Sequence, residues 1–159
     1  MILKHDAGKS RIDLIEADAY STIREMVDKC CPAVVHLDND DLAEIMSEEY
    51  AKTMKYVYKA DGRDDYVGLL GNIAACASVM LENDLQIEEI TQLGDLYGYG
   101  AEMHSENSWK KVESSRFYAA LGRHINYIST GELYDSESKM QHALHILWNC
   151  ITLTYFVGE

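Results

Sequence analysis

Apolar residues recur every three to four positions along most of this chain, which is the spacing of an amphipathic α-helix. The pattern predicts helices at about residues 16–29, 41–60, 66–81, 87–103, 115–128 and 135–156. No segment shows the strict alternation of apolar and polar residues that is typical of a half-buried β-strand. We therefore expect an all-α protein, a helical bundle of about five or six helices.

Residues that start or stop helices refine these boundaries. Pro32 lacks the amide hydrogen that a helix interior uses, so we expect the first helix to end before it. Residues 38–41 offer N-caps for the second helix, and Gly131 is a suitable C-cap for the fifth. Asp135 or Ser136 would cap the start of the sixth helix. The short link that this leaves predicts a C-terminal antiparallel helical hairpin.

The size and charge of the chain limit what it can do. Its 159 residues, 47% of them hydrophobic, fit a single domain over 1–159 with a real core. The formal net charge is −13, and residues 26–90 hold 14 acidic side chains against 5 basic ones. We therefore expect no binding to duplex nucleic acid through a broad basic face and no adsorption to an acidic membrane. A divalent cation would still allow an anionic ligand to bind.

The cysteines and the first residues bear on the cellular compartment. None of the four cysteines forms a C-x-x-C pair or a zinc-like spacing with histidine, so we expect reduced thiols: Cys30, Cys31, Cys76 and Cys150. Residues 1–6 lack the apolar stretch of a signal peptide, and the tract at 67–81 is too short to span a bilayer. The expected location is the cytoplasm.

Polar side chains gather on one face of each of the last two predicted helices. On the fifth helix, this face carries Arg116, Arg123 and Tyr127, with His124 beside it. On the sixth helix, the i, i+3 and i+7 positions are His142, His145 and Asn149. Three carboxylates lie at the connecting end: Glu132, Asp135 and Glu137. If the two faces meet, the cleft between them holds guanidinium, imidazole, amide and carboxylate groups.

This set of groups suits a nucleotide phosphate. Arginine donates two parallel hydrogen bonds to phosphate oxygens, carboxylates bind Mg²⁺, and a carboxylate or a histidine can orient an attacking water. The alternative is that the histidines are satisfied core residues and that the arginines pair with glutamates on a solvated face. The i, i+3 histidines also permit a transition metal, although the spacing fixes no third ligand. Glu44 and Glu48 could bind Mg²⁺ or belong to a solvated acidic face.

An ordered series of motifs resembles a small phage family labelled dATP/dGTP diphosphohydrolase. The motifs are Tyr97–Ala101, Asn107–Lys111, Arg116–His124, Gly131–Ser138, then His142 to His145 and Asn149. The opening residues 6–15 resemble the N-terminal signature of that family. The family-like core would cover about 1–15 and 97–157, and the acidic stretch at about 26–90 would be a helical insertion.

The resemblance implies a phage-encoded protein of the host cytoplasm that hydrolyses a purine deoxynucleotide, dATP or dGTP, to monophosphate and pyrophosphate. The carboxylates lead us to expect Mg²⁺ as the cofactor. The sequence departs from the family at Glu102 and Met103, where members often carry lysines. Glu132 and Asp135 fit the E-x-x-D half of a helical pyrophosphatase site, but no E-x-x-E partner precedes them.

The leading hypothesis assigns roles to particular side chains. The catalytic residues would be Glu132, Asp135, Glu137 and His142. The first three of these would also bind the metal. The substrate-binding residues would be Lys9, Arg11, Trp109, Arg116, Arg123, His124, His145 and Asn149. Two alternatives stay open, a nucleotide-binding protein without turnover and an acidic protein that masks a basic partner. The 11 tyrosines favour a homodimer.

Overall fold

The computed structural model describes residues 9–57, 63–83 and 89–157. These ranges form six α-helices and two 3₁₀ turns, and within them β-structure is limited to an isolated bridge between Tyr134 and Gln141. The prediction of an all-α helical bundle is therefore confirmed. None of the helices in these ranges combines the length and the hydrophobicity needed to cross a bilayer.

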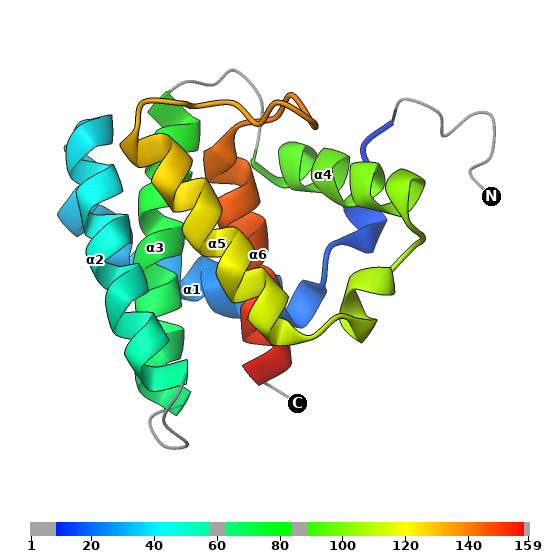
Figure 1. Cartoon of the computed structure of the whole chain (residues 1–159), viewed down its shortest axis with the longest axis horizontal. Coiled ribbons are helices and arrows are strands. Elements are labelled where there is room, and N and C mark those ends of the chain that lie inside the picture. The colour runs from blue at the N-terminus through cyan, green and yellow to red at the C-terminus, as the bar shows by residue number, and fades with distance from the viewer. Residues whose placement is uncertain (1–8, 58–62, 84–88, 158–159) are drawn as a thin grey trace.

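The helices pack around a central pair, α3 (Arg63–Asn83) and α6 (His142–Val157) (Figure 1). In chain order the helices are α1 (Ala17–Val34), α2 (Asn39–Val57), α3, α4 (Glu89–Met103), α5 (Ser114–Ser129) and α6. Helix α3 packs against α1, α2 and α6, while α5 packs against α6 and α2. Helices α5 and α6 lie side by side and run in opposite directions (Figure 1).

Burial explains why α3 and α6 are central. From Leu70 to Leu81, α3 has apolar side chains on nearly every side, and Asn72 is the one residue in this run that is not fully buried. Helix α6 is buried at most of its positions, including Ile146, Leu147 and Ile151. Helices that are apolar all round are stable only when other elements surround them. The surrounding helices α1, α2 and α5 are amphipathic and turn one face to this pair.

Helix α4 forms the side of the molecule opposite α2 (Figure 1), and its first residue, Glu89, forms an ion pair with Arg24 of α1 (3.0 Å). It contacts α6 and the 3₁₀ turn η2 (Ile12–Leu14), and a second turn, η3 (Ser108–Lys111), leads from α4 to α5. The segment before η2 docks closely on α4, since Ser10 Oγ donates to the Thr91 carbonyl (2.7 Å) and the Arg11 amide donates to the Gly94 carbonyl (3.2 Å).

The prediction that the first helix ends before Pro32 was wrong, because α1 continues to Val34. A proline inside a helix removes the hydrogen bond from its own nitrogen to the carbonyl four residues earlier. Here that loss falls in the last turn of the helix, and the Val35 amide still donates to the Cys31 carbonyl (2.8 Å). One missing bond near the end is cheap compared with burying Val34 in the core.

Two predicted caps are confirmed. The Asp38 carboxylate accepts a hydrogen bond from the Asp41 amide (2.9 Å) and so caps α2. Gly131 has a φ of +90°, which disfavours a side chain, and its amide donates to the Ile128 carbonyl (2.9 Å). The Glu132 amide donates to the Tyr127 carbonyl (2.9 Å). These two bonds form a Schellman motif that ends α5. The predicted end of the second helix near residue 60 lies outside the described residues.

The prediction that the sixth helix starts at Asp135 or Ser136 was wrong, because α6 begins at His142. Asp135 does cap, but it caps a turn: its Oδ2 accepts from both the amide and the hydroxyl of Ser138 (2.8 Å each). Lys139 then adopts a left-handed φ of 63°, which interrupts any helix. The link between α5 and α6 is therefore an ordered loop of residues 130–141 that folds back toward the first turn of α6.

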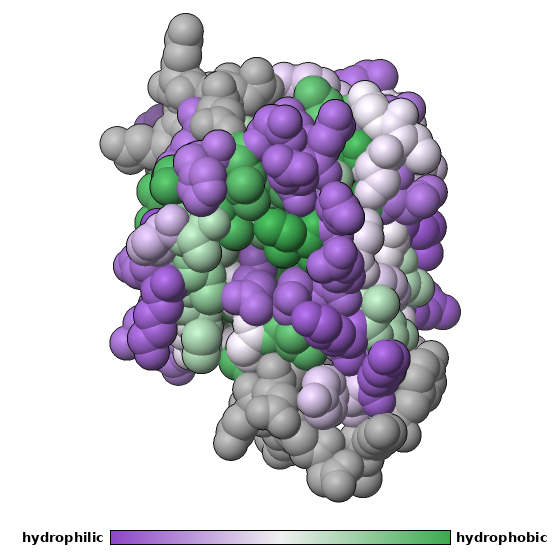
Figure 2. All heavy atoms as spheres, turned by 90° about the vertical axis from the view of Figure 1, so that its left-hand side faces the viewer, coloured by the Kyte–Doolittle hydropathy of each residue, from purple (hydrophilic) through white to green (hydrophobic). Residues whose placement is uncertain are grey.

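The acidic stretch at 26–90 includes all of α2. Its carboxylates at Asp40, Asp41, Glu44 and Glu48 are exposed. The face of the molecule that carries α2 is mainly hydrophilic, around a smaller hydrophobic area (Figure 2). Exposure of Glu44 and Glu48 fits a solvated acidic face.

Candidate functional site

Three histidines from α5 and α6 meet where the two helices pack together. His142 and His145 are three residues apart, so they share a face of α6, and that face is turned toward His124 of α5. The Nδ1 atoms of His124 and His142 are 2.8 Å apart. The rings of His124 and His145 are stacked, with centroids 4.6 Å apart and planes 10° apart. The predicted polar face of α6 therefore meets His124 of α5 at this cluster.

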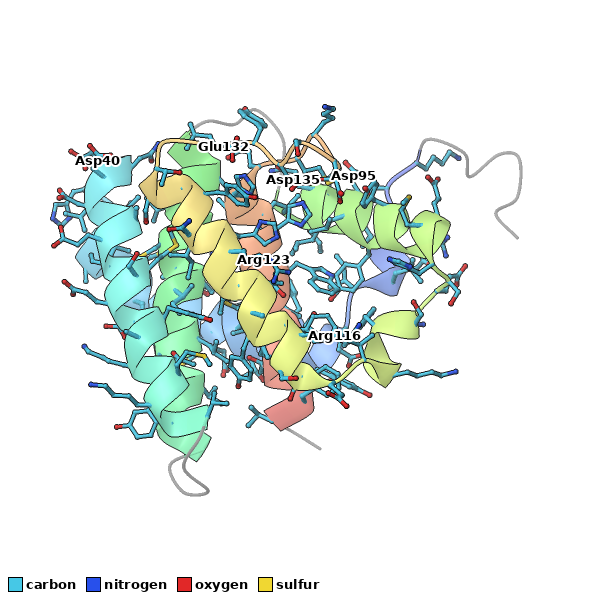
Figure 3. The ribbon with its side chains drawn as sticks, in the orientation of Figure 1. Asp40, Asp95, Arg116, Arg123, Glu132 and Asp135 are labelled. Carbon is cyan, nitrogen blue, oxygen red and sulfur yellow. The ribbon has the colours of Figure 1, made fainter. Side chains whose placement is uncertain are left out.

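The loop of residues 130–141 adds two carboxylates to these histidines. Glu132 Oε2 lies 3.8 Å from His142 Nε2, and Asp135 Oδ2 lies 3.8 Å from His145 Nε2. Figure 3 labels both carboxylates on the loop that crosses the ends of α5 and α6. We call the group His124, His142, His145, Glu132 and Asp135 the histidine–carboxylate cluster.

Ser138 connects two members of this cluster. Its hydroxyl is 2.8 Å from Asp135 Oδ2 and 2.7 Å from His145 Nε2. A hydroxyl has one hydrogen to donate. If that hydrogen goes to the charged Asp135, the Nε2–H of His145 donates to the Ser138 oxygen. The Nδ1 atom of His145 is then left as a proton acceptor.

Near neutral pH the three histidines of the cluster are uncharged and Asp135 is ionised. Burial, together with the neighbouring histidines, lowers the pKa of His124 to about 3. Burial likewise lowers the pKa of His145 to about 4, and it lowers the pKa of His142. Burial alone would raise the pKa of Asp135, but the hydrogen bonds from Ser138 and the adjacent histidines outweigh it and lower that pKa. Near neutral pH the cluster therefore offers unprotonated ring nitrogens and an ionised oxygen donor.

A pocket of about 500 Å³ lies next to the cluster, between α4, η3, α5 and α6. Its walls are largely aromatic: Tyr97, Trp109, Phe117 and Trp148. Ring edges meet ring faces among them, as in the 5.9 Å contact of Tyr97 with Trp148 and the 6.0 Å contact of Trp109 with Trp148. Arg116 and His145 also line the pocket, so His145 belongs to both the pocket and the cluster. A cavity of this size and lining is typical of sites for small organic ligands.

The predicted phosphate-binding arginines lie on the exposed side of α5. Arg116 and Arg123 are seven residues, two helical turns, apart and so share a face (Figure 3). Neither forms an ion pair with a carboxylate of the described residues. Arg116 lines the pocket, and the charge of Arg123 contributes to lowering the pKa of His124, after burial and the other two histidines.

The other predicted residues are divided between the site and the rest of the molecule. Asn149 is buried below His145 and donates to its carbonyl (2.8 Å). Arg11 lies away from the cluster and pairs with Asp13 (2.9 Å) and Glu106 (3.2 Å), while Lys9 is exposed. Glu137 is exposed on the loop.

The expected Mg²⁺ ligands do not converge on one point. Glu132 faces His142, Asp135 faces His145, and Glu137 points to solvent. Among the described residues, the group whose ligand atoms lie within 4.8 Å of one another is His124, Asp135 and His142. Mg²⁺ prefers an octahedron of oxygen atoms. A site with two imidazoles and one carboxylate does not fit that preference.

Of the aromatic residues in the pocket wall, sequence reasoning named Trp109 but missed Tyr97, Phe117 and Trp148. Trp148 follows His145 by three residues, which places both on one face of α6 and was the available signal. Tyr97 belongs to α4 and meets Trp148 only in the folded chain. Ser138 was also missed as the link between Asp135 and His145, because it was expected inside a helix.

A comparison with protein families finds a match in the C-terminal part of the chain. Residues 83–159 match the family model described as dATP/dGTP diphosphohydrolase, N-terminal. The match contains α5, α6, the loop between them and every member of the histidine–carboxylate cluster, whereas residues 6–15 lie outside it. No curated protein and no solved structure matches the chain. Residues 83–159, slightly less than half of the chain, are thus similar to the dATP/dGTP diphosphohydrolase N-terminal family, the family that the motifs resemble.

Proposed function

We propose that this protein hydrolyses a purine deoxynucleoside triphosphate, dATP or dGTP, to the monophosphate and pyrophosphate. The observation that carries the proposal is the aromatic pocket whose wall includes Arg116 and that joins the histidine–carboxylate cluster at His145. These groups lie, with the exception of the pocket residue Leu14, inside the stretch that matches the family.

The pocket accounts for binding of both ends of such a substrate. A purine base presents flat π-faces, and stacking on an aromatic side chain stabilises a bound base by about 1–3 kcal/mol. Trp109 and Trp148 supply such faces. Arg116, which has no carboxylate partner among the described residues, would donate its fork of N–H groups to phosphate oxygens.

His145 is the residue best placed to activate water. It lines the pocket, and Ser138 and Asp135 hold its Nε2 side, which leaves Nδ1 to accept a proton. Water would attack the α-phosphorus, the bond to the bridging α–β oxygen would break, and pyrophosphate would leave with the electron pair. A bound polyphosphate anion would raise the low pKa of His145 and so strengthen it as a base.

The test is pyrophosphate release from each of the four deoxynucleoside triphosphates, with the nucleotide product identified by ion-exchange chromatography. The proposal expects dATP or dGTP to yield the monophosphate. Arg116→Ala should lower kcat/KM about 10- to 100-fold, since a hydrogen bond to a charged group contributes about 1.5–3 kcal/mol. Lys29→Ala, which removes an exposed cation of α1, is the matched control. A wild-type protein that releases no pyrophosphate from any of them contradicts the proposal. The expected Mg²⁺ requirement stays a prediction, which the same assay tests by adding the metal.

Two alternative functions make different predictions. A nucleotide-binding protein without turnover would use the same pocket and would return its ligand unchanged. The exposed carboxylates of α2 (Figure 2) favour an acidic interaction protein, which would bind a basic partner with strong salt dependence and would have no affinity for nucleotides. The expected homodimer also stays a prediction, and size-exclusion chromatography with light scattering would check it.

A further inference from the structure

The geometry points to a binding site for one divalent transition-metal ion, formed by His124, His142 and Asp135. The ligand atoms of these three residues, one from each, lie within 4.8 Å of one another. They come from α5, from α6 and from the loop that connects the two helices. The inference does not depend on the proposed hydrolysis, because it concerns the affinity of the protein for the metal alone.

The two imidazoles are already spaced as neighbouring ligands. A transition metal binds imidazole nitrogen at about 2.0–2.1 Å, so two such nitrogens at right angles lie about 2.9 Å apart and at a tetrahedral angle about 3.4 Å apart. The Nδ1 atoms of His124 and His142 are 2.8 Å apart. Binding at a right angle would therefore leave the two nitrogens where they are, and tetrahedral binding would move them about 0.6 Å further apart. Without a metal, the same two atoms share a single N–H···N hydrogen bond.

The surroundings of His142 fit the tautomer that such a site requires. The side chain is 1% exposed, and its Nε2 atom has no hydrogen-bond partner among the described residues. When Nδ1 binds a metal, the ring hydrogen resides on Nε2, which faces the Glu132 carboxylate at 3.8 Å. A carboxylate behind a metal-binding histidine is a recurring arrangement that fixes the ring and strengthens the ligand.

The remaining two ligands are also held in place by their neighbours. The ring of His124 is stacked on His145, and Asp135 accepts two hydrogen bonds from Ser138. Such supporting contacts set the orientation of ligands before the ion arrives. The ligand positions are therefore preorganised on three elements of the fold.

The donor set selects the class of metal. Imidazole nitrogen favours Zn²⁺, Co²⁺, Fe²⁺ and Ni²⁺, whereas sites for Mg²⁺ are built from oxygen atoms. Two histidines and one carboxylate leave coordination positions open for water or for an oxygen of a ligand, as in catalytic rather than structural metal sites. We therefore expect a Zn²⁺-like preference and weak competition by Mg²⁺.

The experiment is a titration of the full chain, first freed of metal with a chelator, with Co²⁺ alone. Binding is followed by the visible absorption of protein-bound cobalt, and Zn²⁺ or Mg²⁺ is then added as a competitor. We expect one Co²⁺ per chain, displacement by Zn²⁺, and no displacement by a comparable concentration of Mg²⁺. Absence of a saturable cobalt spectrum, or equal displacement by Mg²⁺, would overturn the inference.

Variants tie the signal to these residues. His124→Gln and Asp135→Asn should each weaken Co²⁺ binding by at least about 100-fold. Changing a residue that only supports a metal ligand costs up to about 100-fold in affinity, and removal of the ligand itself should cost at least as much. These two positions are chosen because His142 is so deeply buried that its replacement endangers folding. Circular dichroism and thermal melting verify that each variant is folded. His36→Gln, at an exposed histidine outside the cluster, should bind Co²⁺ as the wild type does.

The outcomes separate this site from the proposed activity. Cobalt affinity that is unchanged in both folded variants would overturn the metal site, whatever the protein does to nucleotides. A protein that binds Co²⁺ at these residues and yet hydrolyses no deoxynucleotide would retain the metal site and lose the proposed function.

Discussion

Acid should destabilise this protein through His145, and the size of the effect follows from its surroundings. The side chain is 14% exposed, and its pKa is about 4 in the folded protein against an ordinary value of 6.5. The unfolded chain therefore takes up a proton on this residue below about pH 6.5, while the folded chain does so only near pH 4. Between these limits the free energy of unfolding falls by about 1.4 kcal/mol per pH unit. The contribution of His145 at about pH 5 is thus a loss of about 2 kcal/mol relative to neutral pH.

The assay is urea denaturation of the metal-free protein at about pH 7.5 and about pH 5, for the wild type and for His145→Gln. Acid also protonates carboxylates and His124, so the informative quantity is the difference in pH dependence between the two proteins. Between about pH 7.5 and about pH 5, the free energy of unfolding should fall by about 2 kcal/mol less in the variant than in the wild type, whatever the absolute stability of the variant. His36→Gln, at an exposed histidine outside the cluster, should retain that dependence. If His145→Gln keeps the full pH dependence, the cluster does not bury His145 as a neutral imidazole.

Two further substitutions test how the site is built. Gly94→Ala should lower the free energy of unfolding by about 1–3 kcal/mol, because a Cβ atom there would lie 2.8 Å from the Ile12 amide nitrogen and would push η2 off α4. Gly68→Ala, where no atom of the described residues lies within 4 Å of the added carbon, should be stabilising instead. Equal effects of the two variants on chemical denaturation would contradict the close packing at Gly94. Ser138→Ala should reduce kcat for pyrophosphate release about tenfold with little change in KM, since it removes the link that orients His145; a variant with unchanged kcat would show that this link is not used.

Helical periodicity was sufficient for the fold class and for half of the site. Apolar spacing predicted the helices now seen, and the i, i+3 spacing of His142 and His145 placed both on one face of α6. These features depend on residues that are close in sequence, so local geometry determines them.

The start of α6 could not be predicted locally. Asp135 and Ser136 are good helix caps by residue type, but Asp135 binds Ser138 in a turn, and Lys139 adopts a left-handed conformation. The loop is further held by the pairing of Tyr134 with Gln141. Those contacts override the local preference for a helix, and they bring Asp135 to the histidines.

The pocket and the third metal ligand depend on contacts between distant segments. Tyr97 of α4 meets Trp148 of α6, and Asp135 approaches His124 across the turn that ends α5. Periodicity shows which face of a helix is polar, but it does not show which faces meet. The sequence therefore indicated a phosphate-binding cleft and Trp109, while the contacts of Trp109 with Tyr97 and Trp148 were visible only in the structure.

The central claim, that the aromatic pocket binds a purine deoxynucleotide, can be tested by tryptophan fluorescence. The chain has 2 tryptophans, and both Trp109 and Trp148 line the pocket, so the signal reports on this site alone. We predict a saturable change in emission when dATP or dGTP is added with tryptophan selectively excited, and a marked loss of affinity in Arg116→Ala. Unchanged emission up to millimolar nucleotide, with the protein folded, would contradict the account.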